Sequence, residues 1–159
     1  MAKQLGIPNF WYWLTAIITL SIDQGTKFTA KVYLEGKTSL PLWEGVLHLT
    51  YATNDGAAFS FLAGQVDWLR WISLAVSLAL LVAGIVYKRW TTTEQFAYGF
   101  ILAGALGNGI DRFAYGYVVD FLEIRLFPFP IFNSADVAIN IGIALLILAI
   151  VREGQSTPR

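Results

Sequence analysis

Uncharged apolar stretches alternate with polar segments along the chain, and each stretch is long enough to predict a helix rather than a strand. The four stretches run from Phe10 to Ile22, Trp71 to Tyr87, Phe96 to Ile110 and Val137 to Val151. A straight transmembrane helix needs ~20 apolar residues, so we expect the flanking charged residues within the headgroup zone. The pattern predicts an α-helical integral membrane protein of one domain over residues 1–159, with spans at approximately 10–27, 68–87, 95–113 and 134–152.

The polar segments contain a second kind of pattern. Gly45 to Thr53 and Leu122 to Phe127 alternate apolar and polar residues, which predicts two strands that pair into a small extracytoplasmic β element. Asn54-Asp55-Gly56 follows the first strand as a turn. Asp23, Lys27 and Lys31 stand one helical turn apart, so the first helix is expected to continue as an amphipathic helix along the membrane surface.

Composition supports the membrane class and narrows the chemistry. Apolar residues make up 56% of the chain, only 14% are charged, and mean hydropathy is +0.56. Basic and acidic residues balance at eleven each, which gives no electrostatic reason to expect a nucleic-acid partner. The absence of cysteine excludes disulfides and thiolate sites, and a single histidine disfavours a histidine-ligated metal or a serine–histidine site. Carboxylates remain as the candidate reactive groups.

Polar residues gather at one rim once the helices are placed antiparallel. The basic residues of the two sides number five and six and do not decide the orientation, but Lys88 and Arg89 stand in a tight turn against a span, which favours cytoplasmic termini. The first, third and fourth helices then bring their polar ends to the outer side: Asp23, Asn108, Asp111, Arg112, Asn133 and Asp136. Gly99, Ala103 and Gly107 repeat every fourth residue and allow close helix approach.

Each of these polar residues also has a purely structural interpretation. Asn133 and Asp136 have the spacing of a capping box at the start of the last helix. Asp111 and Arg112 are interpreted first as members of an ion pair with Asp23 or Lys27. Asn54 is more often part of a turn, and His48 is expected at the surface.

The functional hypothesis concerns Asp120 and Asp136. Two neighbouring carboxyls cannot easily both ionise, so they share a proton. The ionised partner then takes a proton from water while the protonated one donates to a carbonyl oxygen, as in an aspartic protease. A rival hypothesis is a proton- or ion-coupled transporter or channel subunit, which predicts carboxylates spread through the depth of the membrane. A third hypothesis is a membrane scaffold in which the charges at the rim only hold the helices together.

Five segments, in order, resemble the lipoprotein signal peptidases, the bacterial type II signal peptidases. They are Asp23 to Lys27 (DQGTK), Asn54 to Phe59 (NDGAAF), Gly104 to Arg112 (GALGNGIDR), Val118 to Phe121 (VVDF) and Phe132 to Asp136 (FNSAD). The resemblance covers nearly the whole chain. It implies an intramembrane aspartic endopeptidase that removes the signal peptide from diacylglyceryl-modified prolipoproteins, on the N-terminal side of the lipidated cysteine.

The resemblance also implies roles for individual residues. Asp120 and Asp136 would be the catalytic pair. The substrate site would be lined by Asn54, Asn108, Arg112 and Asn133, and the architecture supported by Asp23, Lys27 and Asp111. No metal or other cofactor is implied. The expected partners are lipid-modified prolipoproteins, membrane lipids and globomycin-type inhibitors, and the expected location is the bacterial cytoplasmic (inner) membrane, with both termini cytoplasmic and the active site at the outer leaflet.

Overall fold

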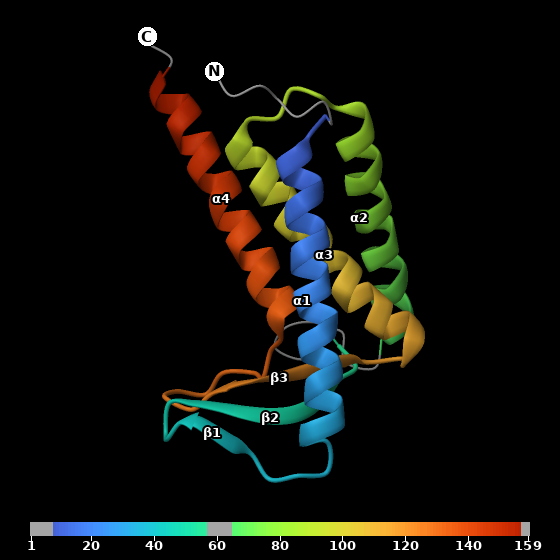
Figure 1. The fold of residues 1–159 in the computed structure, drawn as a ribbon, viewed down its shortest axis with the longest axis vertical. Coiled ribbons are helices and arrows are strands. Elements are labelled where there is room, and N and C mark those ends of the chain that lie inside the picture. Colours follow the sequence, from blue (N-terminus) through green and yellow to red (C-terminus); the bar gives the residue numbers. More distant parts are fainter. Residues whose placement is uncertain (1–7, 57–64, 157–159) are drawn as a thin grey trace.

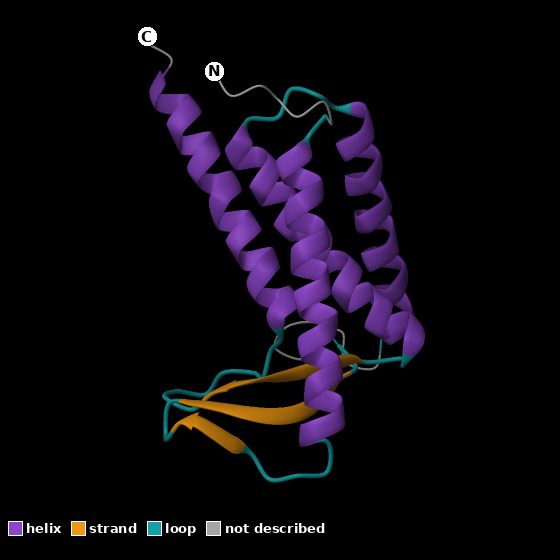
Figure 2. Cartoon of the chain, viewed as in Figure 1, coloured by secondary structure: helices purple, strands orange, loops and turns teal. Residues whose placement is uncertain are grey.

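A bundle of helices stands on a small sheet in the computed structural model, which describes residues 8–56 and 65–156 (Figures 1 and 2). The elements in chain order are α1 (Phe10–Leu34), β1 (Leu40–Trp43), β2 (Leu47–Asn54), α2 (Val66–Val86), α3 (Thr92–Ala114), β3 (Val118–Ile124) and α4 (Ser134–Ser156). α1 begins and α4 ends at the same end of the bundle, opposite the sheet (Figure 1). The order of elements therefore brings the sheet ends of α1, α3 and α4 together, as the sequence pattern predicted.

Helix α3 is the centre of the bundle and contacts α1, α2 and α4. It begins at a capping box in which Thr91 and Glu94 satisfy each other's backbone N–H groups. Its glycines allow the close approach that the small-residue spacing predicted. A Cβ atom on Gly104 would lie 2.5 Å from the carbonyl oxygen of Ala135 in α4, and one on Gly107 would collide with the carboxylate of Asp23 in α1.

The sheet is antiparallel throughout, in the order β1-β2-β3. The two predicted strands are confirmed, but the second begins earlier, at Val118, and ends at Ile124, where the chain turns so that Arg125 N–H donates to Val46. β1 was not predicted because it is short and contains Pro41, which is tolerated at a sheet edge. Pairing of β2 with β3 places Asn54 opposite Val118, two residues from Asp120.

The membrane prediction is supported in part. Within the described residues, two helical segments are long and apolar enough to cross a membrane, Val66–Val86 and Ser134–Arg152. The other two helices carry polar groups within their length, among them Asp23 and Asp111, which lowers their mean hydropathy. Four membrane spans therefore stay a prediction, as does the single domain over residues 1–159.

Two predictions about the first connection are wrong. Residues 23–34 do continue the first helix, but Asp23 and Lys27 are buried rather than directed along a membrane surface, because they find partners on α3. His48 is 3% exposed instead of lying at the surface. Its ring Nδ1 is 3.2 Å from Ser39 Oγ, and its Nε2 accepts a hydrogen bond from Gly45 N–H, because the turn before β2 folds back over it.

Candidate functional site

Asp120 lies in the middle of β3, and its side chain is almost completely buried, at 2% exposure. Each carboxylate oxygen accepts one amide hydrogen bond. Asn54 Nδ2 donates to Oδ2 at 2.9 Å, and Asn133 Nδ2 donates to Oδ1 at 2.6 Å. Burial raises the pKa of Asp120 to about 6, against the two hydrogen bonds, which lower it, and with a smaller contribution from the negative charge of Asp136.

Asp136 lies in the first turn of α4, in the capping box predicted from the sequence. Its backbone N–H donates to Asn133 Oδ1 at 3.0 Å, and its Oδ2 accepts from Asn133 N–H at 3.2 Å. Its Oδ1 accepts a further hydrogen bond from Asn108 Nδ2 at 2.9 Å. The helix terminus thus holds this carboxylate in one orientation, with its oxygens directed back along the chain toward Asn133 and α3.

Asn133 connects the two aspartates. It is fully buried, and its side chain binds Asp120 and Asn108 through Nδ2 while Oδ1 receives the backbone N–H of Asp136. The structure therefore brings together Asp120, Asp136 and the three asparagines that the sequence singled out, from β2, α3, β3 and the start of α4. Each asparagine contacts at least one of the two carboxylates directly.

A buried ion cluster supports this arrangement from the side of α1. Lys27 Nζ lies 3.0 Å from Asp23 Oδ2 and 3.2 Å from Asp111 Oδ2, and it donates to Asn108 Oδ1 at 2.8 Å. These partners use all three ammonium hydrogens. Because the side chains involved are at most 3% exposed, the charges are compensated almost entirely by one another. Lys27 thereby orients Asn108, whose amide faces Asp136.

Arg112 occupies a different position from the other predicted site residues. Its two terminal nitrogens donate to the carbonyl oxygen of Gly56 at 3.0 Å and to Ser73 Oγ at 3.1 Å. Within the described residues it forms no ion pair with Asp120 or Asp136, so it connects the end of the Asn54 turn to α2. Its buried Nε has no hydrogen-bond partner in the part of the chain that the structure describes.

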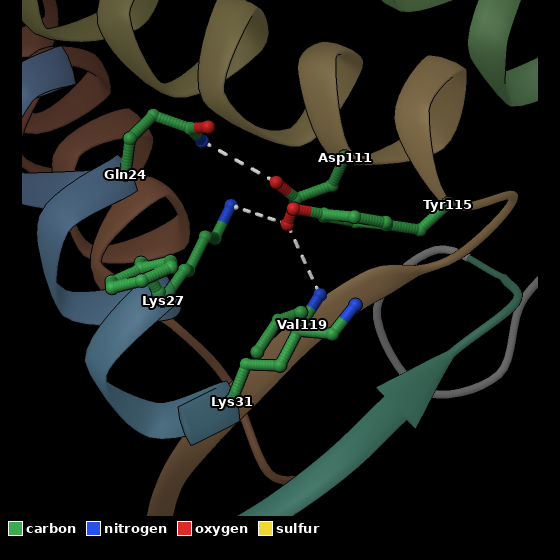
Figure 3. A pocket seen from close by; sticks show the side chains of 7 residues that line it. Gln24, Lys27, Lys31, Asp111, Tyr115 and Val119 are labelled. Carbon is green, nitrogen blue, oxygen red and sulfur yellow. Dashed lines mark hydrogen bonds and ion pairs between the residues drawn. The ribbon is translucent and has the colours of Figure 1, made fainter. Parts of the chain in front are cut away.

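Three further groups complete the network and were not predicted as site residues. Ser134 Oγ donates to Asp23 Oδ1 at 2.7 Å, Gln24 Nε2 donates to Asp111 at 3.3 Å, and the backbone N–H of Val119 donates to Asp111 Oδ2 at 3.1 Å. Figure 3 shows Gln24 and Lys27 reaching Asp111 from α1 and Val119 reaching it from β3. Ser134 had a signal in the sequence, since it follows a helix cap. The backbone N–H of Val119 has no such signal, because every residue except proline carries this donor.

The site contains acids, amides and one compensated lysine, and this composition limits its chemistry. No group of three or more His, Asp or Glu residues that could hold a metal ion occurs within residues 8–56 and 65–156. Two carboxyl groups joined through one buried asparagine, with the pKa of Asp120 raised by burial, can hold one proton as a pair. Acid–base activation of water needs one carboxylate that accepts a proton and one carboxyl that donates a proton, and such a pair provides both.

Comparisons with known proteins agree with one another. A family model described as "Signal peptidase (SPase) II" matches residues 15–152. The lipoprotein signal peptidase of Gloeothece citriformis is 58% identical over 142 residues, which cover 89% of each chain. That of Gloeobacter violaceus is 49% identical over 154 residues, covering 97% of this chain and 89% of the relative. A solved structure titled as a bacterial membrane enzyme is 31% identical, with a TM-score of 0.84 over 93% of this chain and 92% of its own.

Proposed function

The chain belongs to the signal peptidase II family, and from this membership and the site geometry we propose that it is an aspartic endopeptidase in which Asp120 and Asp136 share one proton. Its substrates are prolipoproteins, whose signal peptides it removes. The observation that carries the aspartic assignment is the buried Asn133, which holds both carboxyl groups through direct hydrogen bonds. The finer cleavage position, directly before the lipid-modified cysteine, is part of the proposal.

The reaction follows from a pair of carboxyls that holds a single proton. The ionised carboxylate removes a proton from a water molecule, and the resulting hydroxide attacks the scissile carbonyl carbon. The protonated carboxyl donates its proton to the carbonyl oxygen, which gives a neutral tetrahedral diol. The carboxyl that took the water proton then donates it to the amide nitrogen while the other carboxylate removes a hydroxyl proton from the diol, which breaks the C–N bond, leaves a new carboxyl and a free amine, and returns the pair to one shared proton. The proton belongs to the pair rather than to one residue.

The surrounding residues have supporting roles in this proposal. Asn54, Asn108 and Asn133 hold the carboxylates and line the place where the peptide lies, while Arg112 positions the segment after Asn54. Asp23, Lys27 and Asp111 stabilise α1 against α3 beneath them. The buried acids and cations of the described residues, such as Asp23, Lys27 and Asp120, lie at the sheet end of the bundle, which supports a one-sided hydrolytic site over a proton relay through the membrane.

Two single substitutions test the proposed pair. Asp120→Asn and Asp136→Asn should each lower cleavage of a lipid-modified precursor by about 10²- to 10⁴-fold, because each removes one proton-transfer group. Asp55→Asn is the matched control, since Asp55 is an exposed acid next to Asn54 and should keep normal turnover. Turnover of the purified full chain is followed by the mobility shift of the precursor. Normal activity in either first variant would eliminate the pair.

The same assay tests the cleavage position and the inhibitor. Mass spectrometry of the product should find the lipid-modified cysteine as its first residue, and any residue retained ahead of it would contradict the proposed position. Globomycin is expected to inhibit wild-type turnover in proportion to its occupancy of the site. Turnover unaffected by saturating globomycin would remove that expectation without affecting the Asp120–Asp136 pair.

The proposed location is the bacterial inner membrane, with four spans, both termini in the cytoplasm and the site at the outer leaflet. The chain contains no cysteine, so single cysteines report topology without background. Lys37 lies beside β1 and Lys88 lies in the connection between α2 and α3, and both are exposed. In intact cells, a membrane-impermeant maleimide should label Lys37→Cys and should label Lys88→Cys only after permeabilisation. The reverse pattern would invert the topology.

A further inference from the structure

A pocket of about 250 Å³ opens between α1, the end of α3 and β3, on the far side of the Lys27 ion cluster from Asp136. Its polar lining is drawn in Figure 3, where the residues Gln24, Lys27, Lys31, Asp111 and Tyr115 lie around it. The catalytic proposal uses none of Lys31, Tyr115 or the pocket itself. A concave site with several convergent polar groups calls for a ligand of its own.

The charge that this pocket presents is positive. Lys27 and Asp111 are only 2% and 1% exposed and are saturated by each other and their neighbours. Lys31 is different, because its Nζ donates to Tyr117 Oη at 3.2 Å and lies 3.7 Å from the centre of the Tyr115 ring. Within the described part of the chain it forms no ion pair with a carboxylate. Its ammonium is therefore the lining charge without an ion-pair partner among the described residues, and the carboxylate of Glu35, one turn further along α1, acts on it only at longer range.

The depth of Lys31 corresponds to lipid headgroups in the proposed membrane placement. The hydrogen bond from Ser134 to Asp23 marks where the apolar run of α4 begins. Lys31 follows Asp23 by eight residues, which is about 12 Å along a helix, and a lysine side chain extends back toward the helix N-terminus. Headgroups occupy roughly 5–8 Å outside the hydrocarbon on each side. The Lys31 ammonium thus lies at the level of lipid phosphates.

Apolar side chains continue from the pocket along the outer face of α1. Phe28 lines the pocket and is 68% exposed, and Ile17, three helical turns deeper on the same face of α1, is 62% exposed. A large exposed apolar surface beside a cation is the pattern expected where an acyl chain and a charged headgroup meet the protein together. A free inorganic anion would make no use of this apolar surface.

We propose that this pocket binds the phosphate group of a membrane phospholipid, with the Lys31 ammonium and the Tyr115 hydroxyl as donors and the acyl chains along Phe28 and Ile17. The lipid phosphate joins α1 to the end of α3. Lysine suits this role because its ammonium binds phosphate as a point charge. The inference rests on the proposed membrane placement and not on the aspartic mechanism. The lipid site can therefore be tested if the aspartic mechanism is refuted, and the mechanism can be tested if the lipid site is refuted.

Native mass spectrometry of the detergent-purified full chain tests the proposal with two lipids that differ only in the phosphate. Dioctanoyl phosphatidic acid should bind the wild type, and Lys31→Met should weaken that binding about tenfold, because a charge-assisted hydrogen bond is lost. Dioctanoylglycerol, which has the same chains and no phosphate, should bind both proteins weakly and equally. Lys31→Arg should retain phosphatidic acid binding within about threefold, since the charge is kept.

Two further variants keep the test decisive. Lys37→Met removes an exposed lysine on the same side of the molecule and should leave phosphatidic acid binding unchanged. Tyr115→Phe keeps the ring beside Lys31 and should lower the affinity about threefold through loss of one hydroxyl. Wild-type affinity in both Lys31→Met and Tyr115→Phe would overturn the proposal. Equally tight dioctanoylglycerol binding would overturn the phosphate assignment, and displacement of the lipid by an equal concentration of inorganic phosphate would overturn the lipid assignment.

Discussion

Replacing Lys27 by methionine removes the single cation of the buried ion cluster while keeping the length of the side chain. In the native structure the ammonium lies 3.0 Å from Asp23 and 3.2 Å from Asp111, and its third hydrogen is donated to Asn108. The variant leaves two buried carboxylates facing each other and removes the donor that orients Asn108 toward Asp136. We therefore expect a loss of both stability and activity.

The expected magnitude follows from the burial of the partners. Asp23 and Asp111 are 0% and 1% exposed, so water cannot replace the lost ammonium. Breaking a buried ion pair by removing one partner costs about 3–5 kcal/mol, whereas an exposed pair contributes about 0–1 kcal/mol. A domain has a free energy of unfolding of roughly 5–15 kcal/mol in total. Lys27→Met should therefore lose a large fraction of the stability, with methionine filling most of the lysine volume.

The free energy of unfolding is measured by denaturant titration in mixed detergent micelles. Asp67→Asn is the matched control, because Asp67 pairs with Arg70 at 3.4 Å but its side chain is 85% exposed. It should change the free energy by less than about 0.5 kcal/mol. Adding Asp23→Asn to Lys27→Met should recover part of the loss, since one of the two opposed charges is removed. A Lys27→Met protein within 1 kcal/mol of the control would refute the reasoning.

Three other expectations follow from single contacts. Gly104→Ala should lower the free energy of unfolding by about 1–3 kcal/mol, because its Cβ would lie 2.5 Å from the Ala135 carbonyl oxygen. Gly25→Ala is the control and should be neutral or stabilising, since the space around Gly25 is open. Equal effects of the two substitutions in the same titration would contradict close packing of α3 on α4. Because the pKa of Asp120 rises from 3.8 to about 6 on folding, the folded protein takes up a proton in that window, and stability falls as pH rises from 3.8 to 6 and then stays level. Asp120→Asn should lack this fall of about 3 kcal/mol, and identical pH slopes of the two unfolding curves would contradict the burial argument. Asn54→Leu removes a donor that lowers the pKa of Asp120, so the alkaline limb of kcat/KM should move to higher pH, and an unmoved limb would remove Asp120 from the titrating pair.

Local patterns in the sequence predicted several features that the structure confirms. The apolar runs correspond to helices because helix formation depends on neighbours three and four residues away. The capping box of Asn133 and Asp136 follows from their spacing alone, and both reciprocal hydrogen bonds are present. The antiparallel order of the helices was also sufficient to place the polar ends of α1, α3 and α4 together, as the contacts of Lys27 with Asp111 and of Ser134 with Asp23 confirm.

Predictions that depended on long-range packing were less successful. The spacing of Asp23 and Lys27 predicted a surface helix, but Asp111 and Asn108 on α3 bind Lys27 and make burial of these charges possible. The Lys27–Asp111 contact is the ion pair by which the sequence interpretation first explained Asp111. His48 alternates with apolar residues as an exposed strand residue would, yet the turn before β2 covers it. In both cases the partner that changes the outcome is distant in the chain or is a backbone group.

The sequence contains the aspartates, the asparagines and the helix cap that holds Asp136, because each of these depends on residue identity and short spacing. It contains no information on which carboxylate oxygen each asparagine contacts, since that depends on the rotation of α3 and on the register of β2 against β3. The irregularity in that register between Leu49 and Ala52 precedes the pairing of Ala52 with Asp120. Close helix approach at Gly104 and Gly107 then brings α1 and α4 to the same place. Tertiary packing thus makes a connected site from residues whose sequence positions predict only a shared rim.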